Sequence, residues 1–242
     1  MSRARRIPPA SKTPAPVVAP RLPAGRALRV VERLELADDG VYTDLDISHG
    51  RLANSAARHV TFERVRLRDT DLSHTRLESL VLADVRLEGC DLANGVWRNS
   101  SIDRAEFIEC RLTGLDLADS SLRHVVMREC GAALISLRFA ELGNSRFEDC
   151  VLAEADFQDA KLPGSIVRGS DLRGASLYGA NLHGADLRGS LVDDLRIRAT
   201  DLAGAVIDPI QVAALARTLA SLLGVSVRDL RDDDGGRPGR AS

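Results

Sequence analysis

Residues 170–190 read SDLRGASLYGANLHGADLRGS, and a leucine stands at every fifth position from Leu172 to Leu187. A serine or alanine precedes each of these leucines by two positions, and a glycine follows it by two. The apolar series keeps the same phase back to Tyr42 and forward to Ile207, and none of its members is charged. A period of five fits neither an α-helix, with a period of about 3.6, nor an extended strand, with a period of about 2.

The period instead fits a chain that turns a corner after every five residues, so that four short sides close a coil of twenty. Successive coils would stack at the spacing of a β-sheet, about 4.8 Å, and would pair their backbone groups. The sequence therefore predicts an all-β solenoid over residues 41–208, in which each coil contacts only its neighbours. Its predicted structural core ladder comprises Leu72, Leu92, Leu112, Leu152, Leu172, Phe107, Met127 and Phe147.

Three units of the quoted stretch match the signature A(D/N)Lxx: Asp171-Leu172, Asn181-Leu182 and Asp186-Leu187. On these residues the chain resembles the pentapeptide repeat protein family over about residues 41–208. The resemblance implies a right-handed quadrilateral parallel β-helix of about eight 20-residue coils with a C-terminal capping α-helix. Before about Cys150 the signature weakens, although the apolar series continues. Arginines replace the expected Asp or Asn there, at Arg66, Arg76, Arg86 and Arg111.

The corners of the coil are predicted from the last seat of each unit. Glycine occupies this seat in six consecutive units from Gly164 to Gly189. A type II turn needs a positive φ at its second central residue, where glycine carries no steric cost. Earlier units place residues such as Asp69 or Asn94 in this seat. These residues form Asx turns and tolerate left-handed geometry, so corners are expected there too.

The four cysteines are also spaced by twenty residues, which is one full coil; they are Cys90, Cys110, Cys130 and Cys150. The spacing raises three alternatives: a metal site, a set of cross-links, or a column in the core. A straight ladder does not converge tetrahedrally on zinc, and a reducing compartment disfavours structural disulfides. We therefore predict an inward column of free cysteines that pack as small hydrophobic residues, with no metal or cofactor.

The ends of the chain differ from the repeat. Residues 1–28 are basic and rich in proline, and we expect a disordered tail. This tail is either a solubilising extension, or an annotated start placed too far upstream, or an arm that touches nucleic acid or acidic partners; we favour the first two. Residues 29–40 are expected to form an N-terminal cap. A helix is predicted over 209–224, and residues 225–242 are expected to be mostly disordered.

The predicted C-terminal helix has good end signals, because Asp208 is a favourable N-cap, Pro209 suits the first turn and Gly224 suits the stop. Its apolar residues wrap most of its circumference. One face would cover the last coil and leave apolar surface for a partner. The resemblance to pentapeptide repeat proteins also implies a homodimer through this helix, for which the candidate residues are Ile210, Leu215, Leu219, Leu222 and Leu223.

Composition limits the classes of function. Aromatic residues make up only 3% of the chain, the net charge is −2, and the Arg/Ala-rich bias suggests a GC-rich bacterial genome. This charge predicts no strong attraction to nucleic acid or to an anionic membrane. No apolar run reaches the roughly 18 residues of a membrane span, and no secretory signal is recognisable, so we expect a cytoplasmic protein. The sequence also shows no phosphate loop or nucleophile–base pair, and we predict no catalytic residues.

Two functions remain after this exclusion. The leading hypothesis is a rigid non-catalytic scaffold that binds an unidentified protein partner. The alternative follows from the resemblance: some pentapeptide repeat proteins mimic duplex DNA and bind DNA gyrase. Residues 41–208 hold 27 Asp/Glu against 20 Arg/Lys, which is a diluted imitation of a polyanion. A candidate acidic stripe shares one coil phase and comprises Asp69, Glu109, Glu129 and Asp149.

Overall fold

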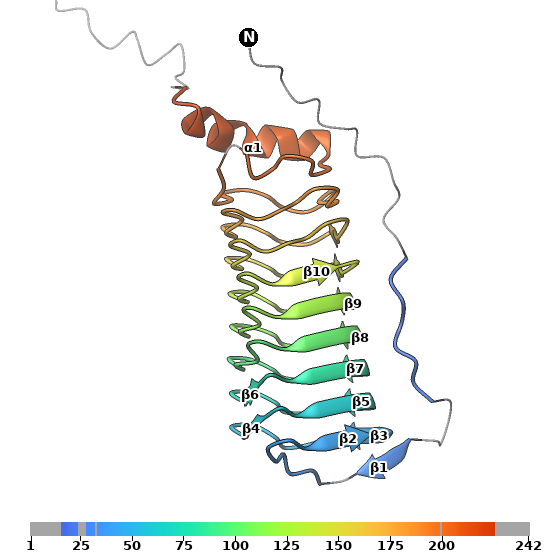
Figure 1. Cartoon of the computed structure of the whole chain (residues 1–242). Helices are drawn as coiled ribbons and strands as arrows, with labels where there is room; N and C mark the ends of the chain where they lie inside the picture. Colours follow the sequence, from blue (N-terminus) through green and yellow to red (C-terminus); the bar gives the residue numbers. More distant parts are fainter. Residues whose placement is uncertain (1–15, 24–27, 32, 199, 226–242) are drawn as a thin grey trace, which may run out of the picture.

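The computed structural model describes residues 16–23, 28–31, 33–198 and 200–225. The chain winds into a parallel β-solenoid, and one helix covers its C-terminal end (Figure 1). Each segment pairs with the segment twenty residues later, as Phe62 does with Leu82. One side carries a ladder of bridges from Arg51 to Leu191 in seven steps of twenty residues. The predicted parallel β-helix is confirmed, with about seven turns where length alone predicted about eight.

Two sheets are formed by strands that stack along the solenoid axis. The large sheet has the order β1-β3-β5-β7-β8-β9-β11-β12, with β10 paired to β9 and β2 paired to β5, and the small sheet pairs β4 with β6. The strands are β1 Arg29–Val31, β2 Val41–Thr43, β3 Leu45–Ser48, β4 Ala56–Arg58, β5 Thr61–Arg68, β6 Arg76–Glu78, β7 Val81–Glu88, β8 Ser101–Ile108, β9 Ser121–Arg128, β10 Glu141–Gly143, β11 Arg146–Glu148 and β12 Ile166–Arg168.

The corners of the coil lie where they were predicted, at the last seat of each five-residue unit. Gly114 has a φ of 68°, and the Leu115 N–H donates to the Leu112 carbonyl at 3.0 Å, which closes a turn of the type II kind. The corner residues that are not glycine also have positive φ, and most of them are Asp, Asn, His, Glu or Arg. Two apolar residues depart from this rule, Leu134 with a φ of 60° and Phe139 with a φ of 57°. Both lie in the same coil.

The interior is a continuous column of apolar side chains. All eight residues of the predicted core ladder are buried. Two large seats hold only alanine, Ala57 and Ala132, and both alanines are buried without a shift of phase. After Ala132 the next inward seat is filled by Ile135, which is fully buried, whereas Leu134 points to solvent. The coil therefore keeps its register through the weakest part of the repeat.

Small inward seats take side chains that can donate to the backbone. Cys110 donates its thiol hydrogen to the Ile108 carbonyl at 3.3 Å, and Ser170, in the same column, donates to the Arg168 carbonyl at 3.1 Å. Thr70 makes the equivalent bond to Arg68 at 3.0 Å. Cysteine, serine and threonine therefore serve the same purpose in this column. Each combines a small volume with a hydrogen for a carbonyl two residues earlier.

At the N-terminal end, β1 pairs with β3, and Tyr42 stacks on Phe62 with ring centroids 5.2 Å apart. The structure differs here from the prediction that residues 1–28 form a disordered tail. Residues 16–23 lie against the coils, and the Arg21 N–H donates to Asp84 Oδ1 at 2.8 Å. The prolines that exclude helix and strand still permit an extended segment, which can pack along a surface. The expectations for residues 1–15 and 226–242 lie outside the described residues.

The helix α1 (Pro209–Leu222) closes the other end. Asp208 accepts the N–H of Ile210 at 2.9 Å and of Gln211 at 3.0 Å, and Gln211 Oε1 accepts the Asp208 N–H at 2.9 Å. This capping box fixes the start of the helix. Gln211 is buried, and its Nε2 donates to the carbonyls of Leu187 (2.6 Å) and Ser190 (2.7 Å). The helix thereby adds a donor for the Ser190 carbonyl and a second donor for the Leu187 carbonyl, which also accepts the Ser190 N–H at 3.2 Å.

Candidate functional site

The cysteine column lies in the core and not at a reactive surface. Cys90, Cys110, Cys130 and Cys150 are all buried and free. Hydrogen bonds with Cys130 and Cys90, together with burial, raise the pKa of the Cys110 thiol. All four thiols are buried, whereas reactive cysteines lie in partly exposed, electropositive surroundings. Among the described residues no group of three or more His, Cys, Asp or Glu could hold a metal ion.

The four residues of the candidate acidic stripe are exposed on one corner of the stack. A glycine, Gly89, interrupts this column between Asp69 and Glu109, and Gly169 follows its last carboxylate. The Asp69 carboxylate lies so close to Gly89 that a Cβ there would come within 2.7 Å of Oδ1, and Asp149 crowds Gly169 in the same way. Two carboxylates of the stripe therefore fold toward the neighbouring coil, and the stripe is discontinuous.

Ion pairs between coils cover the adjacent side. Arg128 contacts Glu148 at 3.0 Å, and Arg86 contacts Glu106 at 3.4 Å. Asp186 lies between Arg168 and Arg188, with Arg188 Nη2 at 2.9 Å. These hydrogen bonds, first that of Arg188 and then that of Arg168, lower the pKa of Asp186 to about 2. Positive and negative groups thus alternate along the stack, and the side is a patchwork of charge.

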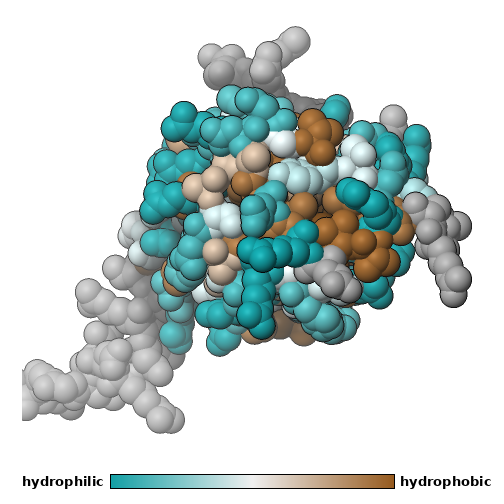
Figure 2. All heavy atoms as spheres, turned by 90° about the horizontal axis from the view of Figure 1, so that it is seen from below, coloured by the Kyte–Doolittle hydropathy of each residue, from teal (hydrophilic) through white to brown (hydrophobic). Residues whose placement is uncertain are grey.

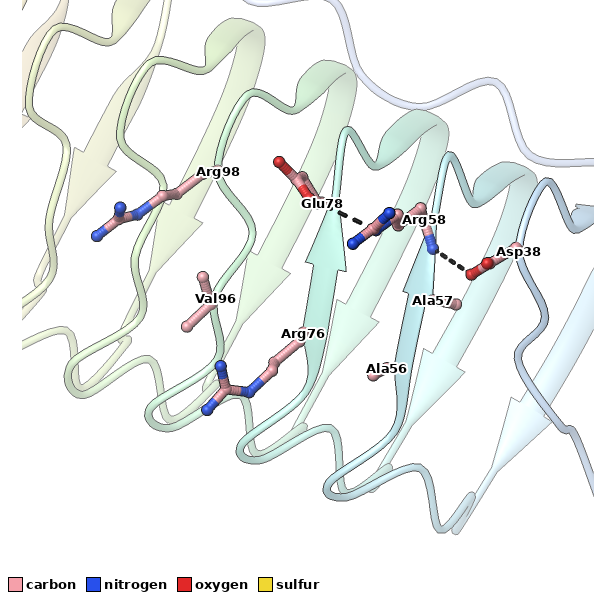
Figure 3. Close-up of a pocket in the computed structure, with 8 residues that line it drawn as sticks. All are labelled: Asp38, Ala56, Ala57, Arg58, Arg76, Glu78, Val96 and Arg98. Carbon is pink, nitrogen blue, oxygen red and sulfur yellow. Dashed lines mark hydrogen bonds and ion pairs between the residues drawn. The ribbon is translucent and has the colours of Figure 1, made fainter.

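A shallow groove lies on the side formed by β4, β6 and the following coils. Its volume is about 540 Å³. Figure 3 shows Arg58, Glu78 and Arg98 along one edge, and Arg76 on the other side of the groove between two small neighbours. Arg58 and Arg98 have acidic partners, whereas Arg76 forms no ion pair with any described residue. The groove presents one guanidinium that suits a carboxylate on another molecule.

Apolar side chains gather at two consecutive corners of one coil. Leu134 is 56% exposed and Phe139 is 48% exposed. Val151 is also exposed, in the next coil, and Arg138 covers part of the Phe139 ring with its guanidinium 5.6 Å from the ring centroid. The other non-glycine corners with positive φ among the described residues carry polar or charged side chains. We call Leu134 and Phe139 the apolar corner patch.

The two ends of the stack also expose apolar groups. On α1, Ile210 is 83% exposed and Leu223, the C-cap residue, is 70% exposed, and Leu222 is exposed as well. The assignment of the other two candidate dimer residues needs correction, because Leu215 is buried and Leu219 packs against the core. They follow Gln211 at intervals of four, so they share the helix face that covers the last coil.

At the opposite end, apolar side chains lie among hydrophilic ones (Figure 2). Val30 and Val41 are the most exposed large apolar residues of this end. No signal in the sequence sets these two valines apart from the apolar residues of the repeat. Within the described part of the chain, no helix has the length and apolar character needed to cross a bilayer.

Solved structures provide three comparisons. A trypsin-treated variant of QnrB1, a plasmid-mediated fluoroquinolone resistance protein, is 21% identical, with 80% of this chain and 99% of that chain covered and a TM-score of 0.37. HetL, a pentapeptide repeat protein involved in heterocyst differentiation regulation from the cyanobacterium Nostoc sp. strain PCC 7120, is 21% identical (70% and 90% covered, TM-score 0.24). Rfr23, a pentapeptide repeat protein from the cyanobacterium Cyanothece 51142, is 12% identical (71% and 90% covered, TM-score 0.20).

Family models give a second comparison. The model of the pentapeptide repeat region matches residues 100–182, and the model of eight pentapeptide repeats matches residues 81–117. A search of the curated proteins finds no significant match. The matched residues are the coils whose five-residue seats, corners and buried ladder are described above. The resemblance seen in the sequence is confirmed, and residues 81–182 of the chain are pentapeptide repeats.

Proposed function

We propose that this protein is a rigid, non-catalytic scaffold that binds a protein partner through the side of its solenoid. The observation that carries the proposal is the apolar corner patch, Leu134 and Phe139. Large exposed apolar groups, aromatic ones above all, are typical of the centre of protein interfaces. Their position on a stack of paired coils gives a partner a preformed surface, so that little ordering accompanies binding.

Backbone geometry supports the same surface. Leucine and phenylalanine at positive φ cost of order 1 kcal/mol or more relative to glycine or asparagine. Leu134 and Phe139 both adopt this geometry, with φ of 60° and 57°, while their side chains remain half exposed and gain little burial within the chain. A cost that the fold does not recover is consistent with a use outside the fold, namely contact with another protein.

The alternative of a DNA mimic that binds gyrase is not our proposal. Such a mimic needs a continuous line of negative charge. The acidic column is interrupted by Gly89 and ends before Gly169, and the next side alternates arginine with carboxylate, as at Arg128 and Glu148. These features favour a partner that is recognised by apolar contact and local charge pairs.

Photo-crosslinking tests the scaffold proposal. A photoreactive phenylalanine analogue at Phe139 should yield a discrete adduct with one protein in cells that express the chain. The matched control places the same analogue at Asp119, which is the same corner one coil earlier and also has positive φ. Identical adduct patterns at the two positions, or no adduct at Phe139, would contradict a binding surface at this corner.

We also propose that two copies associate through α1. The exposed apolar residues support this proposal, namely Ile210 in the first turn of α1 and Leu222 and Leu223 at its end, because exposed apolar groups are typical of interaction sites. The contact would be isologous, with the same helix face on both copies. It would leave the sides of both stacks free for other proteins.

A further inference from the structure

Residues 16–23, PVVAPRLP, run along one corner of the stack, nearly parallel to its axis (Figure 1). Two main-chain groups attach the segment. The Arg21 N–H donates to Asp84 Oδ1 at 2.8 Å, and the Val18 N–H donates to His124 Nδ1 at 3.4 Å. The side chains of Val18 and Arg21 are not used in these bonds, and both residues are exposed.

The spacing of these bonds fits a polyproline II helix. Asp84 and His124 are forty residues apart in sequence, so two coils separate them, a rise of about 9.6 Å. The two donors are three residues apart, and three residues of polyproline II rise about 9.3 Å. One turn of the extended segment therefore matches two coils of the solenoid. Pro16 and Pro20 favour this conformation because their φ is fixed near −65°.

Burial along the segment is consistent with the same threefold period. Val17, Pro20 and Pro23 are half-buried, as is Leu22 beside them, whereas Val18 and Arg21 are exposed. A polyproline II helix has three residues per turn, so Val17, Pro20 and Pro23 form one row. This row faces the coils. The corner thus contacts two kinds of group on the segment: main-chain N–H groups and a row of proline or aliphatic side chains.

The same pairing of an arginine with an aspartate occurs at this corner in two places, which are two coils apart. Arg104 binds both carboxylate oxygens of Asp84 (2.6 and 2.8 Å), and Arg64 binds those of Asp44 in the same way (2.6 and 2.9 Å). The Asp84 side chain is 11% exposed, against 42% for Asp44. The hydrogen bond of Arg104, supported by the Arg21 N–H, lowers the pKa of Asp84.

We propose that this corner, defined by Asp84, Arg104 and His124 and called the proline track, is a docking site for an extended proline-rich segment of a partner protein. Residues 16–23 occupy the track in cis and compete with that partner. The contacts use chemistry that many proline-rich segments offer, namely a free N–H every third residue beside a row of prolines. This inference deepens the proposed scaffold role, and the track lies on a different corner from the apolar corner patch.

Competition between residues 16–23 and a free peptide should change the measured affinity of that peptide. A tethered segment has an effective concentration on the order of 1 mM. If a free peptide binds the open track with a Kd of about 100 μM, the tethered segment weakens its apparent binding about tenfold. Release of the segment should therefore strengthen the binding of a free peptide by this factor.

The test uses the full chain and a fluorescein-labelled peptide of sequence PVVAPRLP. The double variant Val17→Asp with Arg21→Pro removes one apolar contact and one donor, and it should bind the peptide about tenfold more tightly than the unmodified chain. Ala19→Asp adds a charge at an exposed position of the same segment and should behave like the unmodified chain. Absence of binding to the double variant, or equal binding to all three proteins, would overturn the proposal.

A second pair of variants separates the track from general effects on the coil. When it is added to the double variant, in which residues 16–23 are released, Asp84→Ala should abolish peptide binding. Asp44→Ala removes an equivalent ion pair and should leave peptide binding unchanged. In the unmodified chain, Asp84→Ala should also speed hydrogen exchange at the Arg21 amide, and Asp44→Ala should not. Equal effects of the two variants would refute the track.

Light scattering of the double variant tests whether residues 16–23 dock on a second copy of the chain instead of on their own coils. If the release alone lowers the particle mass, residues 16–23 dock on a second copy, and the proposal of a cis competitor is overturned. An unchanged mass supports it. Because the crosslinking experiment at Phe139 is independent of the track, failure of one proposal does not entail failure of the other.

Discussion

Leu117 and Arg123 lie only six residues apart and occupy opposite kinds of seat. Leu117 is fully buried in the column, and Arg123 is exposed and forms no ion pair with a described residue. Leu117→Asp places a charge in the packed axis and should lower the free energy of unfolding by about 4 kcal/mol or more. Arg123→Asp should change it by less than about 0.5 kcal/mol. Urea unfolding measures both, and equal losses would show that the seats are wrongly assigned.

Thiol chemistry gives a second test at the residue scale. Each of the four cysteines is buried, and the neighbouring hydrogen bonds and burial raise the pKa of Cys110 and Cys150. We expect almost no reaction of the native protein with Ellman's reagent, and four equivalents per chain in denaturant. Rapid reaction of a native thiol would indicate that this part of the core opens easily.

At the scale of single elements, one polar side chain strengthens the contact that α1 makes with the last coil through Leu215 and Leu219. Gln211 donates to two carbonyls of the last coil and also completes the capping box with Asp208. Gln211→Ala removes both bonds to the coil, leaves the Ser190 carbonyl without this donor and breaks the capping box, and it should cost about 2 kcal/mol of stability. Arg217→Ala, at an exposed position of the same helix, is the control. Similar melting temperatures for both variants would argue against this role of Gln211.

The Asp186 cluster couples two coils in a pH-dependent way. The pKa of Asp186, about 2, lies below the ordinary value of 3.8. The stability that the Asp186 charge contributes is therefore present above about pH 4 and is lost as the pH falls through 2. Asp186→Asn should lower the free energy of unfolding by about 2 kcal/mol at pH 7. The difference from the unmodified chain should shrink near pH 2.

Urea unfolding at about pH 7 and at about pH 2.5 measures this difference. Asp193→Asn serves as the control, because Asp193 is exposed and forms no ion pair with a described residue. A deficit of Asp186→Asn that stays the same at both pH values would mean that the charge of Asp186 does not contribute.

At the scale of the whole molecule, association through α1 predicts a particle of twice the 26.1 kDa chain mass. Ile210→Glu with Leu223→Glu places charges on the exposed apolar surface and should give monomers by light scattering at micromolar concentration. Val30→Glu changes a similarly exposed residue at the opposite end and should leave the dimer intact. A monomeric unmodified chain would refute the proposal.

The five-residue pattern was enough to predict the repeat and the interior of this protein. A seat in a five-residue unit is a local property, and strict repetition carries the same assignment from Tyr42 to Ile207. The inward ladder, the cysteine column and the corners could therefore be predicted without knowledge of distant contacts. Even Ala132, which is small for its seat, did not shift the phase.

The contacts at the surface and at the two ends could be assigned from the three-dimensional fold and not from the pattern. Apolar residues surround α1, so the pattern did not show that Leu215 and Leu219 would face the coil, or that Gln211 would join them. The path of residues 16–23 was equally hidden, because it depends on the match between the rise of polyproline II and the spacing of two coils. Such contacts join segments far apart in sequence, and their energies depend on distances that no local pattern records.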